Sequence, residues 1–210
     1  MTLSLGPLES FVLMKALIVS DVHVGSPHFL CSEFRLFLKT MPSGFGLILN
    51  GDIVCRWVKE EELPVEHKDI LSMLVSESEK RRVVWVTGNH DRKFRPSDPG
   101  KIEFVPFLEV DGIYIAHGHD FDVIRRYSGS FVIIFRFLHA LRVRFGAEFI
   151  HVAHYAKKFK RLYGFLRRSV MRNAVKKAKE RRCHAVVCGH THYAEDLISN
   201  GIRYVNTGSW

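Results

Sequence analysis

The chain has 210 residues, of which 47% are hydrophobic and 25% charged, so it can bury a core of its own and is not expected to be disordered. Its four cysteines form no C-x-x-C pair, which argues against a disulfide framework and a zinc ribbon and favours a cytoplasmic protein. The formal net charge of +9 indicates an anionic partner, such as nucleic acid, a phosphorylated ligand or an acidic membrane surface.

The N-terminal segment, residues 1–13, is expected to be an unstructured tail or to precede the native start, because Met14 stands directly before a strand-like run. Pro7 and Glu9 interrupt the apolar stretch that a signal peptide would need. No part of the sequence reaches the roughly 18 consecutive apolar residues of a membrane-spanning helix.

Strand-like and helix-like segments alternate in the first half of the chain. Apolar, β-rich runs predict strands at 15–23, 45–52 and 83–91, and apolar residues at helical spacing predict helices at 29–41 and 64–82. This alternation is typical of an α/β protein.

The second half of the chain adds antiparallel strands. One hairpin is predicted at 107–120, with its turn at Asp111-Gly112, and another at 196–208, with its turn at Asn200-Gly201, because these dipeptides favour two-residue turns. A further apolar strand is predicted at 184–192, between the two hairpins.

One segment departs from this rhythm. Between Asp122 and Arg182 the sequence lacks proline, is rich in Arg, Lys, Phe and Tyr, and predicts two or three basic amphipathic helices. We interpret this segment, at about 122–182, as a helical insert in a single domain that spans residues 1–210. Such helices can lie at an anionic membrane surface, where each basic residue contributes ~1 kcal/mol. Their apolar side can also form a chamber for acyl chains or pack against the sheet.

Five of the predicted strands end in clusters of Asp, Asn and His. Groups just beyond the carboxyl ends of the strands of an open α/β sheet converge on one crevice, so these clusters are expected to meet. Each cluster alone is typical of a turn or a helix cap, and a preceding glycine would permit the tight turn that each cluster needs. The clusters are Asp21-Val22-His23, Gly51-Asp52, Gly88-Asn89-His90-Asp91, His117-Gly118-His119-Asp120 and Gly189-His190-Thr191-His192.

The chemistry of these side chains indicates a metal site. Carboxylates and imidazoles gathered without thiolates suit Mn²⁺, Fe or Zn²⁺ better than Ca²⁺, which prefers sites made of oxygen atoms. Because there are more candidate ligands than one ion needs, we expect two divalent ions.

As a set, the motifs "SDVHVG", "NGDIV", "TGNHD", "AHGHD" and "GHTH", with the closing "YVNTGSW", resemble those of the calcineurin-like metallophosphoesterases. The resemblance covers nearly the whole chain. It implies a four-layer αββα sandwich, here with a helical insert, and two divalent ions, Mn²⁺ in the first place with Fe or Zn²⁺ as alternatives. Two such ions can activate a water and hold phosphate oxygens for in-line attack, so we expect phosphoester or phosphoanhydride hydrolysis.

The resemblance also implies a role for each motif residue. His90 would act beside the leaving group, with Asp91 orienting its ring. His119, Arg125 and Arg126 are the candidate substrate-binding residues, with His119 alternatively supporting a metal ligand. The implied metal ligands are Asp21, His23 and His192 for one ion, Asn89, His117 and His190 for the other, and Asp52 as the bridge between them.

The substrate is suggested by a finer resemblance. "HGHDFD" followed by a basic helical segment is similar to the UDP-2,3-diacylglucosamine pyrophosphatases, which release UMP and an acylated sugar 1-phosphate during lipid A synthesis. This implies a nucleotide-sugar lipid as substrate and peripheral contact with the inner face of the cytoplasmic membrane. Cys55 stands where that subgroup usually has an acidic residue, a departure that concerns the uridine or sugar contacts and not the metal site.

Two other functions stay open. A phosphodiesterase or nuclease of the same fold would use the basic segment to grip the phosphates of cyclic nucleotides or nucleic acid. A non-catalytic interaction scaffold would have no need of His90. The sequence indicates no particular oligomeric state.

Overall fold

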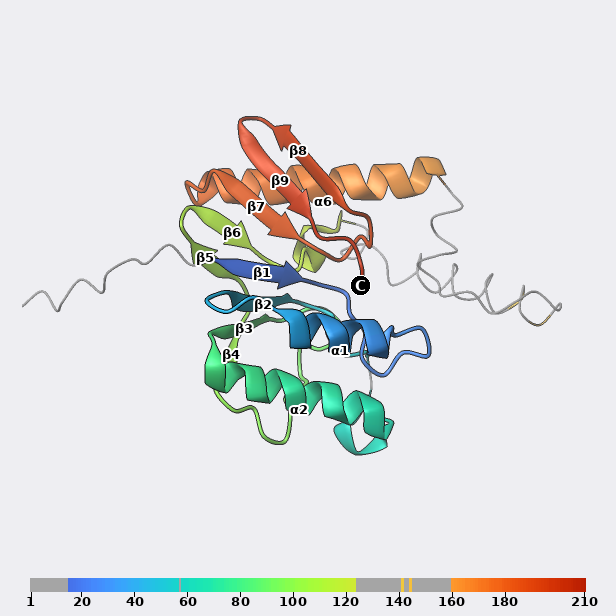
Figure 1. Ribbon diagram of the computed structural model, residues 1–210. Coiled ribbons are helices and arrows are strands. Elements are labelled where there is room, and N and C mark those ends of the chain that lie inside the picture. Colours follow the sequence, from blue (N-terminus) through green and yellow to red (C-terminus); the bar gives the residue numbers. More distant parts are fainter. Residues whose placement is uncertain (1–14, 57, 124–140, 142–143, 145–159) are drawn as a thin grey trace, which may run out of the picture.

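The computed structural model of the protein describes residues 15–56, 58–123, 141, 144 and 160–210 (Figure 1). The predicted N-terminal tail lies outside these residues. So do most of the predicted insert and the two candidate substrate-binding residues Arg125 and Arg126.

The first sheet is built from parallel strands in the spatial order β1-β2-β3-β4. Every residue of β2 and β3 is buried, which is why both strands read as unbroken apolar runs. Two helices, α1 (Cys31–Thr40) and α2 (Val65–Lys80), cover its outer face, and a short 3₁₀ turn, η1 (Glu60–Glu62), precedes α2. The strands are β1 (Ala16–Val19), β2 (Gly46–Asn50), β3 (Val83–Val86) and β4 (Glu103–Val105).

The second sheet is mixed, with the spatial order β5-β6-β7-β9-β8. Strands β6, β7 and β9 are parallel, whereas β5 and β8 each pair with a neighbour in the antiparallel direction. A long helix, α6 (Lys160–Glu180), covers its outer face, and a 3₁₀ turn, η2 (His119–Phe121), follows β6. The strands are β5 (Leu108–Val110), β6 (Ile113–Ile115), β7 (Ala185–Cys188), β8 (Glu195–Ser199) and β9 (Ile202–Asn206).

Three apolar layers join these elements into a sandwich. One lies between α1, α2 and the first sheet, and another lies between the second sheet and α6, where Ala174 and Ala178 are fully buried. The third lies between the sheets and includes Ile48, Val84 and Val187. The layer order is therefore αββα, as Figure 1 shows, and the predicted fold class is confirmed.

Outside the predicted insert, the predicted helices, strands and hairpins are present among the described residues. Asp111 and Gly112 have φ of 49° and 70°, and Asn200 and Gly201 have φ of 51° and 78°, as two-residue hairpin turns with two left-handed positions require. The sequence analysis missed β4, an edge strand of three residues with no apolar alternation to reveal it.

Helix α6 lies inside the predicted insert but belongs to the sandwich. Its buried face, with Val170, Ala174 and Ala178, packs on the second sheet. The last part of the segment therefore packs its apolar side against the sheet, which is one of the alternatives given above. Because α6 is part of the sandwich, the predicted end of the insert at Arg182 does not separate this helix from the domain. None of the described helices combines the length and apolar character that a membrane span needs.

The inter-sheet layer generates a stability prediction. Replacing Ile48, which is 1% exposed, by Ala should lower the free energy of unfolding by about 2–5 kcal/mol, because it removes buried methyl groups and leaves a cavity. The control Ile198→Ala removes the same atoms from a side chain that is 77% exposed, and should change stability by no more than about 0.5 kcal/mol. Urea unfolding of both variants is the measurement, and equal losses would contradict the assigned layer.

Candidate metal centre

The polar clusters that follow the strands are tied together by hydrogen bonds between their loops. Asp21 N donates to Gly51 O at 3.0 Å, and His23 N donates to Asp52 O at 3.0 Å. Gly189 N donates to His117 O at 2.9 Å, which links the loops after β6 and β7. The loops therefore form one connected surface at the carboxyl ends of the strands.

Carboxylates join the remaining loops. Asp52 Oδ1 accepts a hydrogen bond of 2.8 Å from the backbone N of His90. Asp21 Oδ2 accepts one of 3.0 Å from the backbone N of His190 and one of 2.6 Å from Ser20 Oγ. Each of these aspartates thus holds the backbone of a histidine that comes from a distant part of the chain.

Five of the predicted ligands have a left-handed backbone. Such a conformation is uncommon for residues other than glycine and costs about 1–3 kcal/mol, so it persists only where the surrounding structure imposes it. Strain of this kind gathers at functional sites. The five residues are Asp21 (φ 53°), His23 (φ 57°), Asp52 (φ 53°), His190 (φ 66°) and His192 (φ 53°).

At two positions in these loops the backbone lies so close to neighbouring residues that only glycine fits. A Cβ atom on Gly88 would lie well inside 3.0 Å of Asp52, and one on Gly189 would lie equally close to Ser20 and Asp21. Real Cβ atoms essentially never approach so closely. Glycine at these positions therefore lets the loops carry their ligands to a common point.

The structure brings Asp21, His23 and His192 into one group. Their potential ligand atoms all lie within 4.8 Å of one another, with His192 Nε2 3.1 Å from Asp21 Oδ1 and 3.3 Å from His23 Nε2. Burial and the neighbouring His192 lower the pKa of His23 to about 4. The imidazole of His23 is therefore neutral at physiological pH, which is the form that binds a metal.

A second group consists of Asp21, Asp52 and His117, and all three residues are buried. His117 Nδ1 donates to the carbonyl of Asn50 at 2.9 Å, so Nε2 faces the carboxylates, 3.3 Å from Asp52 Oδ2 and 4.0 Å from Asp21 Oδ1. A histidine that ligates a metal usually donates its other ring N–H in this way. Burial lowers the pKa of His117, but the charges of Asp52 and Asp21 outweigh it and raise that pKa to about 10.

These residues fit divalent metal ions. Asn89 Oδ1 is a buried side-chain atom with no hydrogen-bond partner among the described residues, and the buried Asp21 Oδ1 and His117 Nε2 face only other predicted ligands. Native structures rarely leave buried polar atoms in this state, and a cation would satisfy them. The donor set of carboxylates, an amide oxygen and imidazoles suits Mn²⁺, Fe or Zn²⁺.

Two predicted ligands fall outside both groups. Asn89 precedes His90 in the loop after β3, and its side-chain oxygen, as noted above, has no hydrogen-bond partner among the described residues. The His190 ring points to Asp122, with Nε2 3.1 Å from Oδ2. The sequence analysis left Asp122 without a role in the site, although the acidic residues of "HGHDFD" were a signal that could have identified it.

His90 lies at the edge of the candidate centre. Its Nε2 is 3.8 Å from Asp52 Oδ2, and its ring centroid is 4.9 Å from that of His23. Burial lowers the pKa of His90. The ring is held near the ligand groups while part of it stays open to solvent.

Asp91 does not orient the His90 ring, contrary to the expected role. Its Oδ2 accepts hydrogen bonds from Ile53 N at 2.7 Å and Trp85 Nε1 at 3.1 Å, and its Oδ1 accepts one from Gly88 N at 2.7 Å. His90 Nδ1 has no hydrogen-bond partner among the described residues. The fully buried Asp91 therefore fixes the loops after β2 and β3 instead.

His119, the described member of the candidate substrate contacts, is buried in η2. Its ring centroid lies 5.5 Å from that of His117 and 6.5 Å from that of His190, and its Nε2 lies 3.4 Å from Asp120 Oδ1. This position beside two predicted ligands favours a role in supporting the metal centre.

Helix α6 fixes the loop that carries the last two histidines. Tyr163 Oη donates a hydrogen bond of 2.5 Å to Thr191 O. Arg167 pairs with Glu195 at 2.5 Å, and its guanidinium lies 3.3 Å from the centroid of the Tyr193 ring. The sequence analysis did not single out these residues, because their partners come from separate elements.

A cleft of about 590 Å³ begins beside His90. Glu60 closes one side, since its Oε2 accepts hydrogen bonds from Ser97 N and Oγ at 2.7 and 2.8 Å. Of the basic residues, Arg92 and Lys93 make no ion pair with the described residues. The lining comprises Cys55, Arg56, Val58, Lys59, Glu60, Glu61, Asn89, His90, Arg92, Lys93, Phe94, Arg95 and Ser97.

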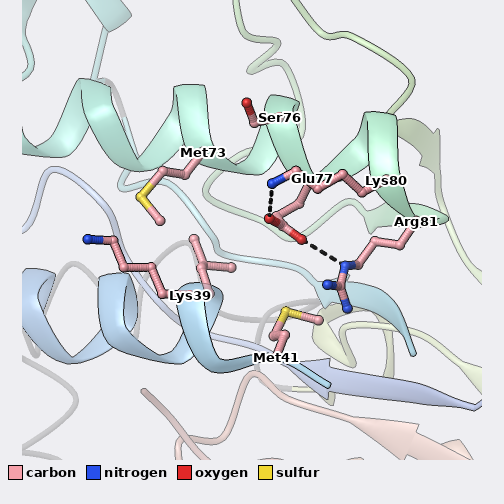
Figure 2. A pocket seen from close by; sticks show the side chains of 8 residues that line it. Lys39, Met41, Met73, Ser76, Glu77, Lys80 and Arg81 are labelled. Carbon is pink, nitrogen blue, oxygen red and sulfur yellow. Dashed lines mark hydrogen bonds and ion pairs between the residues drawn. The ribbon is translucent and has the colours of Figure 1, made fainter. Parts of the chain in front are cut away.

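A second hollow, of about 410 Å³, lies between α1 and α2 (Figure 2). Glu77 pairs with two of its three basic side chains, Lys80 at 3.0 Å and Arg81 at 2.7 Å. Arg81 closely precedes β3, so this hollow lies at the amino ends of the strands, at the opposite edge from the histidines.

Comparison with known proteins gives a family match. A model of the family described as calcineurin-like phosphoesterase matches residues 14–194. A search of curated proteins found no match.

Several solved structures resemble the chain at low identity. A conserved uncharacterized protein from Streptococcus pneumoniae, called a predicted phosphoesterase, is 18% identical with a TM-score of 0.42, over 92% of this chain and 71% of that one. The nuclease MPE of Pseudomonas putida is 16% identical with a TM-score of 0.46, over 93% and 78%. The phosphoesterase Yfce of E. coli is 18% identical with a TM-score of 0.43, over 93% and 80%. Structural similarity at these identities and TM-scores does not indicate the substrate.

The charged state of His117 generates a prediction for metal binding. In the metal-free protein its pKa of about 10 keeps the ring protonated at neutral pH, and the ring must lose that proton to ligate an ion. Loading Mn²⁺ at about pH 8 should therefore release about one proton from His117. Calorimetric titrations in Tris and in Hepes, whose ionisation enthalpies differ, measure the released protons. The variant His117→Ala should lose this release, and identical heats in both buffers for the unmodified protein would contradict the prediction.

Proposed function

The chain belongs to the calcineurin-like phosphoesterase family and is a metal-dependent phosphoesterase, and we propose on this basis that its centre holds two divalent ions and hydrolyses a phosphodiester or phosphoanhydride. The observation that carries the proposal is the meeting of Asp21, Asp52 and His117 with His23 and His192 at the carboxyl ends of the strands. Mn²⁺ is the ion that we propose, with Fe or Zn²⁺ as alternatives.

The proposed ligands divide between the two ions. Asp21, His23 and His192 would hold one ion, and His117, Asn89 and His190 would hold the other, with Asp52 shared. Bound ions of this kind lower the pKa of water and neutralise the charge that develops on a phosphoryl group. Asp122 would keep the ring of His190 in place through the contact at 3.1 Å.

The protein's own residues prepare the site for this chemistry. Asp52 holds the backbone of His90 by a hydrogen bond of 2.8 Å, and Asp91 fixes the same loop from inside. The lowered pKa of His90 leaves a neutral ring whose N–H can donate to the leaving oxygen as negative charge develops there. His90 is therefore the proposed catalytic side chain, whereas Asp91 is a positioning residue.

For the substrate, we propose UDP-2,3-diacylglucosamine or a related nucleotide-sugar lipid. The sequence resemblance is the first support. The second is the exposure of two aromatic residues, Tyr193, which follows His192 in the loop and is 43% exposed, and Phe165 of α6, which is 47% exposed. Exposed aromatic residues beside basic ones suit an acylated anion at a membrane surface. Peripheral contact with an anionic membrane, at the cytoplasmic face, is part of this proposal.

The cleft beside His90 favours a second candidate. Five basic residues line it, and Arg92 and Lys93 carry charges that no described acid neutralises. Such a surface also suits the phosphates of a nucleic acid or a cyclic nucleotide. A phosphodiesterase or nuclease is therefore the alternative function.

A substrate panel tests the two candidates. The Mn²⁺-loaded protein should hydrolyse UDP-2,3-diacylglucosamine at least tenfold better, by kcat/KM, than UDP-glucosamine without acyl chains, because remote binding energy can position the pyrophosphate. Release of UMP is the measurement, with single-stranded DNA and cyclic nucleotides assayed in parallel. Cleavage of these alone would reject the lipid substrate in favour of the alternative. Failure on every phosphoester, with two ions bound, would reject the proposed reaction.

The role of His90 generates a separate prediction. His90→Ala should lower kcat by ~10²–10⁴-fold, because the variant loses the donor to the leaving oxygen, while both ions and the fold are retained. Metal analysis and circular dichroism accompany the kinetics. The matched control His184→Ala changes a histidine that lies at the start of β7, away from the centre, and should retain kcat. Loss of an ion from the His90 variant would show that His90 is a ligand.

A further inference from the structure

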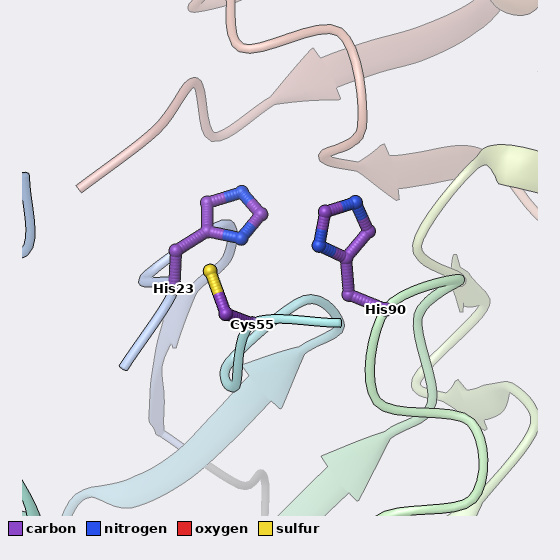
Figure 3. A group of neighbouring side chains, drawn as sticks. All are labelled: His23, Cys55 and His90. Atoms are coloured by element: carbon purple, nitrogen blue, oxygen red, sulfur yellow. The ribbon is translucent and has the colours of Figure 1, made fainter. Parts of the chain in front are cut away.

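A third group of potential metal ligands lies beside the candidate centre. The ligand atoms of His23, Cys55 and His90 all lie within 4.8 Å of one another, and all three residues are partly buried. Figure 3 shows the sulfur of Cys55 beside the His23 ring, with the His90 ring facing them and the three side chains coming from separate loops. This group differs from the other two because it contains a thiol.

The backbone holds these three residues together. Cys55 N donates a hydrogen bond of 2.9 Å to Val24 O, next to His23 in the chain. His23 N and His90 N are bonded to Asp52, through its carbonyl and its carboxylate. The positions of the thiol and both rings are therefore set by the same loops that build the candidate centre.

The donor set selects a different class of ion. A thiolate with two imidazoles suits Zn²⁺ and its heavier relative Cd²⁺, whereas Mn²⁺ prefers oxygen-rich sites. At Zn–S and Zn–N distances of about 2.3 and 2.0–2.1 Å, neighbouring donors of a tetrahedral site are roughly 3.5 Å apart. The observed ligand atoms, which lie within 4.8 Å of one another, would have to approach by roughly 1 Å to reach that spacing.

We propose that His23, Cys55 and His90 form an inhibitory site for a thiophilic divalent cation, Zn²⁺ or Cd²⁺. A cation bound there is ligated by His23, which is then no longer available to the proposed catalytic ions. It is also ligated by His90, whose ring then cannot donate to the leaving oxygen. Occupation of this site therefore stops turnover. Binding at this site stands independently of the proposed function, whereas the inhibition rests on it.

Cadmium provides a readout that needs no substrate. CdCl₂ is titrated into the full-length Mn²⁺-loaded protein, and the ultraviolet charge-transfer band of a cadmium thiolate is recorded. The unmodified protein should show the band, and Cys55→Ser should lose it. The matched control is Cys31→Ser, because the Cys31 thiol is equally partly buried but lies in none of the three ligand groups and donates to Glu66 O. This control should retain the band.

A second variant tests the histidine ligands. His90→Ala should keep the thiol but weaken Cd²⁺ binding at least tenfold, with circular dichroism confirming its fold. A band of unchanged strength and affinity in Cys55→Ser or in His90→Ala would overturn the proposed site.

Inhibition is measured in parallel, with each protein compared with its own uninhibited rate. Half-inhibition by Zn²⁺ should need at least a tenfold higher concentration in Cys55→Ser than in the unmodified protein and in Cys31→Ser. An equal sensitivity would overturn the inhibitory role. If the cadmium band is present but no phosphoester is hydrolysed, the ligand site stands and the proposed function fails; if the band is absent while hydrolysis proceeds, the reverse holds.

Discussion

Two carboxylates, Asp21 and Asp52, are buried at the edge of an apolar sandwich, with exposed fractions of 1% and 2%. Burying a charge is costly unless it is paired and hydrogen-bonded, so the surrounding loops must supply compensation. They do so with backbone N–H groups from His90 and His190 and with the His117 ring. Divalent ions would complete this compensation, and the site is built to receive them.

This requirement accounts for the backbone of the site. The loops after the strands must turn sharply and approach one another closely, so ligands adopt left-handed conformations and glycines stand where a Cβ would collide. The apolar layers on both sides of each sheet and the buried hydrogen bonds of Asp91 maintain this strain. The stability of the sandwich and the chemistry of its edge are therefore linked.

The same edge places different ligand chemistries side by side. Oxygen and nitrogen donors form the two groups around Asp21, whereas Cys55 adds a sulfur donor from the same loop as Asp52. His23 belongs to one of the groups around Asp21 and also to the group with the thiol, so ions at the two proposed sites would compete for one imidazole.

Local sequence patterns were enough to predict every described strand except β4, the helices α1 and α2, both hairpin turns and the clusters at the strand ends, because apolar period and turn-forming dipeptides act over a few neighbouring residues. Only the tertiary structure decided which side chains meet. It paired His190 with Asp122, turned Asp91 toward Ile53, Gly88 and Trp85, placed Cys55 beside His23 and His90, and joined α6 to the second sheet. Most of these contacts join residues far apart in the chain, and the geometry of all of them depends on how whole loops and layers pack, which no local pattern encodes.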